Sequence, residues 1–305
     1  MVRTTPVAGS PLPKRPPWFG LHLAGLGSTL ELAAQAQRAE ELGFDMLAVD
    51  RDVLSGSPPG LEVWTALTWA AASTTSIQVV PNVLALPNRH PALLAKMAES
   101  LDRLSGGRLI LALGAGASVN DSALDALGLQ KLSPAERVAA TSEALDVIHG
   151  LWSEAGFSYA GTHFTIAGAD LQPRPASHPP VWLGAYGPRM LDLTGRKADG
   201  WVPSLFLLGP DLAERALARV RAAASWAARD PDTLTYAYNV GVLVDEKATG
   251  TPGQVVGGPA EAAEQLAGFL DRGFTCLSCW VRGGTGEQLE RLAGQVIPAV
   301  RDRLA

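Results

Sequence analysis

The 305-residue chain is poor in the residues that mark metal sites, membrane spans and nucleic-acid surfaces. It has 2 cysteines and 5 histidines, and the histidines are scattered without metal-ligand spacing. Only 18 % of the residues are charged and the net charge is −5, which argues against a nucleic-acid partner. No apolar run is long enough to span a membrane, and the N-terminal segment lacks the apolar core of a signal peptide. We therefore expect a cytoplasmic protein with no metal site and no membrane or nucleic-acid partner.

The two cysteines, Cys276 and Cys279, form a C-x-x-C sequence, a spacing that can mark a redox pair or a metal site. Here they lie within Phe274–Trp280, a run typical of a β-strand. Residues three apart on a strand point to opposite faces of the sheet. We therefore expect both thiols to be packing residues.

The chain does have a large apolar fraction, 47 %, arranged as short strand-like runs that alternate with helical patterns. This alternation is typical of βαβ units. Strands are expected at Trp18–Leu23, Asp45–Val49, Ile77–Leu84, Arg108–Leu113, Pro180–Leu183, Gly200–Pro203, Leu234–Val244 and Phe274–Trp280. Helices are expected at Leu30–Leu42, Leu61–Ala72, Pro91–Leu104, Pro134–Trp152, Pro188–Lys197, Asp211–Arg229, Pro259–Arg272 and Glu287–Leu304, with a hairpin excursion at Phe157–Ile166.

Eight strands alternating with eight helices favour an α/β fold of the closed (β/α)8 TIM-barrel type over an open doubly wound sheet. The turn after the first strand lacks the third glycine of a dinucleotide-binding sequence. We expect residues 18–305 to form one barrel domain after a Pro-rich leader at residues 1–17. Long loops near 115–133 and 245–258 would be inserted at the C-terminal face of the strands. Pro81 predicts a bulge or distortion in the third strand.

Barrel enzymes build their sites from the residues that follow each strand. His22 follows the first strand and could carry a proton or be a satisfied polar residue of the barrel mouth. Asp50 follows the second strand, where a site role competes with that of a cap or ion-pair partner. Its neighbour Arg51 could bind an anionic substrate or pair with a carboxylate. Trp201 and Trp280, near later strand ends, are candidates for the walls of a substrate pocket.

The segment Gly184-Ala185-Tyr186-Gly187-Pro188-Arg189 leads from the fifth strand into a helix. Free backbone N–H groups and the helix dipole suit a phosphate there, and glycine allows close approach of the backbone. An ordinary tight turn is the alternative. Phosphate sites recur in the later loops of barrels, which strengthens the binding interpretation.

Several separated segments resemble the bacterial luciferase-like monooxygenase superfamily. They are Arg89-His90-Pro91, Leu101–Arg108, Gly114-Ala115-Gly116, Pro180–Leu191, Ala198–Trp201, and the tail from Gly273-Phe274 to Val296-Ile297-Pro298. The resemblance covers nearly the whole chain from Trp18. Members of this superfamily are monooxygenases that use reduced FMN or oxidoreductases that use the deazaflavin coenzyme F420.

The resemblance implies which residues would hold a flavin-type ring. A bulged third strand, often with a non-proline cis peptide, supports the ring in this superfamily, and the matching bond here is Asn82–Val83. In the F420 branch an acidic residue after the second strand contacts the ring, which matches Asp50. An asparagine after the fourth strand contacts the cofactor tail, which matches Asn120. The remaining cofactor-binding candidates lie in the two glycine-rich turns and are Ala115, Gly116, Ala185, Tyr186, Gly187, Pro188 and Arg189.

Two positions depart from the F420 dehydrogenases of the superfamily. Arg51 stands where some of them carry histidine, and Ala117 stands where some carry glutamate. These departures argue against a sugar-phosphate dehydrogenase. They also leave the identity of the proton donor open, with His22 or Asp50 as hypotheses for handling a proton.

The resemblance implies an oxidoreductase that transfers a hydride between coenzyme F420 and a small organic substrate. One alternative is a two-component monooxygenase that uses reduced FMN and O2, and another is a barrel that binds a flavin or deazaflavin without catalysis. The expected partners are a second copy of the chain, docked through the helices at 61–72 and 91–104, and a reductase that supplies reduced flavin or F420.

Overall fold

The structure, a computed structural model, describes residues 17–23, 29–49, 61–116, 121–250, 253–282 and 286–304. Three predicted site residues, Asp50, Arg51 and Asn120, lie outside these ranges. So does the proposed leader, apart from Pro17.

Nine described strands run in parallel around the barrel in the order β3-β2-β1-β12-β10-β9-β8-β5-β4. The ring closes because Val79 of β3 pairs with Leu109, just before β5, while β4 pairs with β5 itself. β3 and β4 are the two halves of the expected third strand, interrupted at Asn82 and Val83. The predicted barrel is thereby confirmed. The strands are β1 Trp18–Leu23, β2 Met46–Val49, β3 Gln78–Pro81, β4 Leu84–Ala85, β5 Leu111–Gly114, β8 Val181–Gly184, β9 Gly200–Trp201, β10 Thr235–Val244 and β12 Cys276–Val281.

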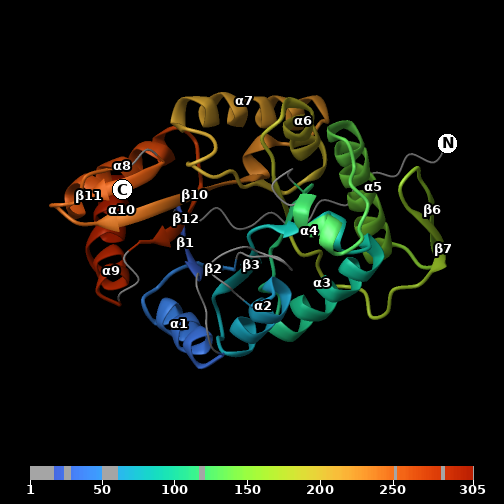
Figure 1. The fold of residues 1–305 in the computed structure, drawn as a ribbon, viewed down its shortest axis with the longest axis horizontal. Coiled ribbons are helices and arrows are strands. Elements are labelled where there is room, and N and C mark those ends of the chain that lie inside the picture. Colours follow the sequence, from blue (N-terminus) through green and yellow to red (C-terminus); the bar gives the residue numbers. More distant parts are fainter. Residues whose placement is uncertain are drawn as a thin grey trace.

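Helices follow the strands and cover the outside of the barrel (Figure 1). Five of them, α3, α5, α6, α7 and α8, have proline in the first turn, where the missing N–H has no helical partner to lose. This is why their starts could be predicted closely. The helices are α1 Thr29–Glu41, α2 Val63–Ala72, α3 Pro91–Ser105, α4 Asp121–Ala126, α5 Pro134–Ser153, α6 Pro188–Lys197, α7 Pro210–Trp226, α8 Pro259–Asp271, α9 Gly286–Arg291 and α10 Ile297–Leu304, the last two joined by a π-helical segment at Leu292–Val296.

Both expected long loops contain secondary structure that the sequence did not predict. The short helix α4 lies within 115–133. Within 245–258 a short strand, β11 (Gln254–Gly257), pairs in parallel with the end of β10, off the closed ring. The expected excursion at 157–166 is confirmed as an antiparallel hairpin of β6 (Phe157–Ala160) and β7 (Thr165–Ala169), which lies beside α5 (Figure 1).

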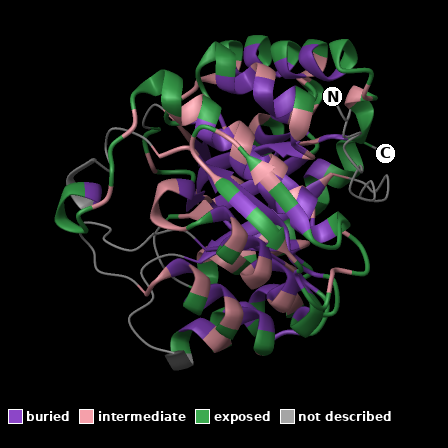
Figure 2. Cartoon of the chain, turned by 90° about the vertical axis from the view of Figure 1, so that its right-hand side faces the viewer, coloured by how far each residue is buried: buried purple, intermediate pink, exposed green. Residues whose placement is uncertain are grey.

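Apolar side chains fill the barrel and also the layer between the strands and the helices. Buried residues occupy the centre of the molecule, and exposed ones lie on the outer faces of the helices (Figure 2). Cys276 belongs to the interior cluster with Trp18 and Trp182, whereas Cys279 packs in the outer layer. The two thiols are buried and free, on opposite sides of the strand as expected. Within the described ranges, no helix has both the length and the apolar character needed to cross a membrane.

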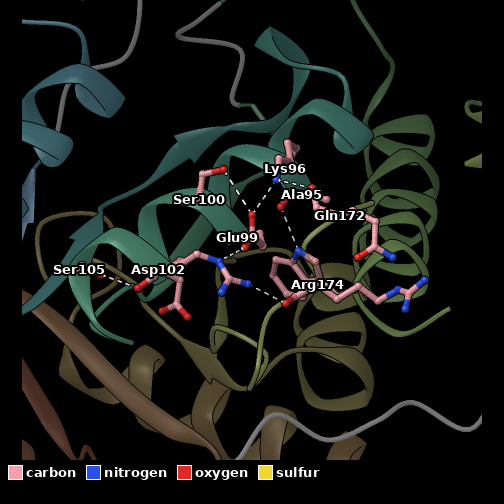
Figure 3. Close-up of polar contacts among 10 residues, drawn as sticks. Ala95, Lys96, Glu99, Ser100, Asp102, Ser105, Gln172 and Arg174 are labelled. Atoms are coloured by element: carbon pink, nitrogen blue, oxygen red, sulfur yellow. Dashed lines mark hydrogen bonds and ion pairs between the residues drawn. The ribbon is translucent and has the colours of Figure 1, made fainter. Parts of the chain in front are cut away.

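A buried carboxylate on α3 holds the segment that leads into β8 (Figure 3). Glu99 is 1 % exposed and binds Lys96 Nζ at 2.8 Å and Arg103 Nε at 2.6 Å. The same two cations donate to the carbonyl oxygens of Gln172 at 2.9 Å and Arg174 at 3.0 Å. Burial raises the pKa of Glu99, but the hydrogen bonds from the two cations outweigh it and leave the pKa below its usual value. An ionised Glu99 therefore orients both cations toward this segment.

Candidate functional site

A cavity of about 640 Å³ lies at the C-terminal ends of the strands, where α5 and α6 begin. Nine of the predicted cofactor-binding residues line it, while the other two, Asp50 and Asn120, lie outside the described ranges. The nine are Asn82, Val83, Ala115, Gly116, Ala185, Tyr186, Gly187, Pro188 and Arg189. Segments distant in sequence are thus brought to one site, as expected for the strand ends of a barrel.

Val83 forms part of the wall of this cavity. The Asn82–Val83 peptide is cis, as predicted. Gly114 and Gly184, the last residues of β5 and β8, are register partners. A Cβ on Gly114 would lie 2.8 Å from Val83 Cγ2, and one on Gly184 would lie 3.3 Å from Val83 Cγ1. The two glycines therefore make the room that Val83 occupies at the strand ends.

The start of α6 forms another part of the cavity wall. Gly187 is the N-cap and has no side chain to cap the helix, and a Cβ at this position would meet no described residue within 4 Å. Arg189 follows in the first turn and is exposed. An open helix N-terminus with an adjacent guanidinium suits an anion such as a phosphate.

Side chains from other elements fix the backbone around the cavity. Arg137 of α5 donates to the carbonyl oxygen of Gly116 at 2.8 Å, which ties the end of β5 to that helix. The Tyr186 hydroxyl accepts a hydrogen bond from the Ser204 N–H at 3.2 Å. Both contacts hold glycine-rich turns that have no regular secondary structure of their own.

Polar side chains from four segments meet at the floor of the cavity, from β1, the break between β3 and β4, the residues after β9, and β10. Asn82 Nδ2 donates to Asn239 Oδ1 at 2.7 Å, and Asn239 Nδ2 lies 3.2 Å from both Asn82 Oδ1 and Ser204 Oγ. His22 Nε2 lies 3.1 Å from Asn82 Nδ2 and 3.2 Å from Asn239 Oδ1. His22 is therefore joined to the cavity through the two amides, although it does not itself line it.

His22 is neutral at physiological pH. It is 5 % exposed, and burial lowers its pKa to about 3 despite the hydrogen bond with Asn239, which acts in the opposite direction. Its Nδ1 is buried and has no hydrogen-bond partner among the residues that the structure describes. The ring of Trp280 lies beside it, with 4.3 Å between the ring centroids, and Trp280 in turn lies 5.9 Å from Phe206.

The structure places Trp201 elsewhere than the sequence predicted. Its side chain is fully buried in the outer layer, where it stacks on Phe274 and donates to the carbonyl oxygen of Ala185 at 2.9 Å. Neighbouring residues on a strand face opposite sides, and its neighbour Val202 faces the cavity instead. Trp201 thus holds the glycine-rich turn through Ala185, from the outer layer and not from the cavity.

Sequence reasoning missed Asn239 and Arg137. Asn239 lies in the middle of β10 rather than after it, so a search of strand ends passes over it. The signal was a polar residue alternating with Ala237 and Gly241 in an otherwise apolar strand. Arg137 lies on α5 and gave no such signal, because an arginine on a helix is usually a solvated residue.

Residues 19–250 match the family model described as luciferase-like monooxygenase, which is most of the chain.

Two curated relatives are similar to about half of the chain. A phthiodiolone/phenolphthiodiolone dimycocerosates ketoreductase of Mycobacterium tuberculosis is 38 % identical over 159 residues, which are 51 % of this chain and 40 % of that protein. An F420-dependent glucose-6-phosphate dehydrogenase of Kineococcus radiotolerans is 32 % identical over 178 residues, which are 56 % of this chain and 51 % of that protein. The chain therefore spans about half the length of the curated relatives it matches.

Solved structures share the fold over nearly the whole chain. An F420-dependent secondary alcohol dehydrogenase, in complex with an F420-acetone adduct, superimposes with a TM-score of 0.84 at 19 % identity, covering 94 % of this chain and 100 % of the other. A long-chain alkane monooxygenase superimposes with a TM-score of 0.80 at 14 % identity, covering 95 % and 92 %. At these identities the similarity establishes the fold alone.

Proposed function

Because the chain belongs to the luciferase-like monooxygenase family, we propose that it is an oxidoreductase that exchanges a hydride between coenzyme F420 and a small organic substrate. The observation that carries the proposal is the cavity that runs from Val83 to the N-terminus of α6. It offers an apolar support at one end and an anion site at the other, as a ring with a phosphate-bearing tail requires. The F420-dependent relative and the F420-dependent structural neighbour favour this cofactor.

The residues present fit such a cofactor. Val83 would support a planar ring. Gly114 and Gly184 allow it to do so, because a side chain at either position would crowd Val83. Gly187 and Arg189 would bind the phosphate. We assign Asn120 to the cofactor tail from the family resemblance. When bound, the cofactor supplies the hydride acceptor or donor, and the protein binds, orients and shields it.

Proton transfer at this site falls to Asp50 rather than His22. Because the pKa of His22 is lowered to about 3, its imidazole is not protonated to the cation near pH 7 and has no such proton to donate. We propose Asp50 as the group that handles the proton. We assign Arg51 and Trp280 to the substrate pocket. Replacement of each of His22 and Asp50 by Ala, with cofactor binding retained, tests this division: turnover should fall further in Asp50→Ala than in His22→Ala, and unchanged turnover in Asp50→Ala would contradict the assignment.

The decisive experiment for the cofactor is a fluorescence titration of the purified protein with oxidised F420 and, separately, with FMN. We expect saturable binding of F420 that is tighter than that of FMN. Tight binding of FMN alone would overturn the assignment in favour of the monooxygenase. Binding of neither, together with no hydride transfer, would overturn both.

The second candidate function is a two-component monooxygenase that uses reduced FMN and O2. The specific observation in its favour is the shared fold with the long-chain alkane monooxygenase. For either function we propose a cytoplasmic homodimer supplied by a separate flavin or F420 reductase. Equilibrium sedimentation tests the dimer.

A further inference from the structure

The side chain of Tyr186 joins the glycine-rich turn after β8 to Ser204, which follows β9. Both residues line the cavity, and the Ser204 N–H donates to the Tyr186 hydroxyl at 3.2 Å. A backbone N–H can only donate, so the phenolic oxygen is the acceptor in this bond. A tyrosine hydroxyl also carries one O–H of its own, which this contact does not use. Tyr186 therefore brings a hydrogen-bond donor to the wall of the cavity.

The Tyr186 hydroxyl keeps its proton at physiological pH. Burial raises the pKa of Tyr186, and the hydrogen bonds with the side chain and the N–H of Ser204 lower it only in part. Bonds that lower the pKa of a phenol stabilise the phenolate oxygen, which can only accept. The contacts with Ser204 thus occupy the acceptor side of the hydroxyl, and the neutral phenol offers its O–H to another group.

A line of polar side chains connects this hydroxyl with the proposed ring support. Ser204 Oγ lies 3.2 Å from Asn239 Nδ2, and Asn239 pairs with Asn82, the residue before Val83. The hydroxyl is therefore fixed on the side of the cavity floor and not at the start of α6, where the phosphate is proposed. A ligand oxygen that it binds belongs to the part of the site where a substrate must meet the ring.

The segment that follows Ser204 is apolar and forms a tight turn. The backbone N–H groups of Leu207 and Leu208 donate to the Ser204 carbonyl oxygen at 3.0 and 2.9 Å. In this turn Phe206 is 60 % exposed and Leu207 is 58 % exposed, and the Phe206 ring lies 5.9 Å from that of Trp280. Large apolar side chains that cluster in the open beside a cavity are typical of a binding surface. The hydroxyl therefore adjoins a surface that suits an apolar molecule.

We propose that the Tyr186 hydroxyl binds the substrate by donating its O–H to a carbonyl or hydroxyl oxygen, while Phe206 and Trp280 contact the apolar part of the same molecule. The proposal rests on the proposed function and names the kind of substrate that the site takes. A hydrogen bond donated to a carbonyl oxygen polarises the carbonyl for hydride transfer. Tyr186 keeps its proton in this contact, so the proton of the reaction is still handled by another group.

The first measurement is the F420 titration of the wild-type protein, Tyr186→Phe and Tyr236→Phe. Tyr236→Phe is the matched control, because its hydroxyl donates to the Pro231 carbonyl oxygen at 2.9 Å and its ring packs in the outer layer. We expect the F420 affinities to agree within about threefold. A loss of F420 affinity of about tenfold that is confined to Tyr186→Phe would assign the hydroxyl to the cofactor and overturn the proposal.

The second measurement is the infrared carbonyl band of 13C-labelled cyclohexanone bound to the F420-saturated protein. This probe has an apolar ring and one acceptor oxygen. We expect a shift to lower wavenumber in the wild-type protein and in Tyr236→Phe that is lost in Tyr186→Phe, with probe affinity about five- to tenfold weaker. An unchanged band and affinity in Tyr186→Phe would overturn the proposal and leave the O–H with Ser204 Oγ or water.

The apolar contact is tested with Phe206→Ala. Cyclohexanone affinity should fall about fivefold or more, and its advantage over acetone should shrink. Trp226→Ala is the matched control, since Trp226 is 85 % exposed at the C-terminal end of α7, away from the cavity. Equal effects of the two variants would overturn the apolar contact.

Failure of the proposed function is read separately, from the F420 titration of the wild-type protein. If F420 does not bind, the proposed cofactor is wrong, and the infrared measurement is made with FMN where FMN binds and on the cofactor-free protein where it does not. The carbonyl band in Tyr186→Phe then still decides whether the hydroxyl binds the probe.

Discussion

Arg108 illustrates how one side chain joins several elements of the barrel. It closes the Leu101–Arg108 segment and is 7 % exposed. Its guanidinium donates to the carbonyl oxygens of Ala71 at 2.7 Å and Ser105 at 2.6 Å, and to Thr74 Oγ1 at 2.9 Å. It thereby satisfies buried carbonyl groups at the ends of α2 and α3 that have no partner within their helices. The presence of Arg108 in the family-like segment Leu101–Arg108 is therefore explained by a structural role and not by catalysis.

Replacing Arg108 by lysine should lower the free energy of unfolding by about 2–3 kcal/mol. An ammonium is a point charge and cannot reach acceptors on both helices at once, so buried carbonyl groups would be left unpaired. Urea denaturation monitored by circular dichroism measures the loss. Arg215→Lys on the exposed face of α7 is the matched control and should be neutral. Equal stability of the two variants would contradict the assigned role.

At the scale of elements, the third strand and its neighbours shape the site together. β3 ends at Pro81, β4 resumes at Leu84, and Val83 between them rests against the glycines that end β5 and β8. The distortion predicted from Pro81 is therefore confirmed, as an interruption of the strand between Pro81 and Leu84. The proline accounts for the break in the strand, and the glycines account for the space beside it.

Gly114→Ala should weaken F420 binding by about tenfold or more. The added Cβ would lie 2.8 Å from Val83 Cγ2, so Val83 must move toward the cavity, and overpacking of this kind costs about 1–3 kcal/mol. The fluorescence titration gives the dissociation constants. Gly268→Ala on α8 is the control, because a Cβ there meets nothing within 4 Å and the helix tolerates alanine well. Unchanged F420 affinity in a folded Gly114→Ala protein would remove Val83 from the ring support.

The Glu99 cluster is also a property of an element, since it fixes α3 to the segment before β8. Glu99→Gln should lower the free energy of unfolding by about 1–2 kcal/mol, less than for a fully buried pair because Lys96 and Arg103 are about half exposed. Thermal and urea unfolding would measure it. Asp125→Asn, which breaks the exposed pair with Lys131, should cost less than about 0.5 kcal/mol. Similar losses in both variants would show that burial of Glu99 contributes nothing.

At the scale of the whole molecule, closure of the barrel buries His22 where water cannot solvate its cation. Its pKa falls from 6.5 to about 3 on folding. Between these two values of the pH, the unfolded chain binds a proton at this histidine and the folded protein does not. The stability contribution is therefore complete above the unfolded pKa and is lost as the pH falls from about 6.5 toward 3.

We expect His22 alone to lower the free energy of unfolding by about 2 kcal/mol between pH 7 and pH 5. His22→Gln should make the stability less steep over this range in urea titrations. His163→Gln is the control, because that histidine lies at the edge of the hairpin and is only partly buried. If the wild-type protein and His22→Gln lose stability in parallel, His22 is not held neutral by the fold.

Much of the fold and part of the site could be read from local features of the chain. The alternation of strands and helices, the proline-marked helix starts and the glycine-rich turn each depend on neighbouring residues, whose steric preferences act before any tertiary contact. The cis Asn82–Val83 bond was located from the family resemblance. The strand β11 was missed because four residues carry too little periodicity to distinguish a strand from a loop.

The sequence by itself therefore determined the barrel, the position of its site at the strand ends and the candidates for its cofactor. Only the tertiary structure decided which of those residues meet. It turned Trp201 away from the cavity, because strand alternation and packing on Phe274 set its face. It also brought Asn239 to Asn82 and His22, a contact between residues far apart in the chain that depends on the register of the closed barrel. The charge state of His22 follows from that burial, which no local pattern records.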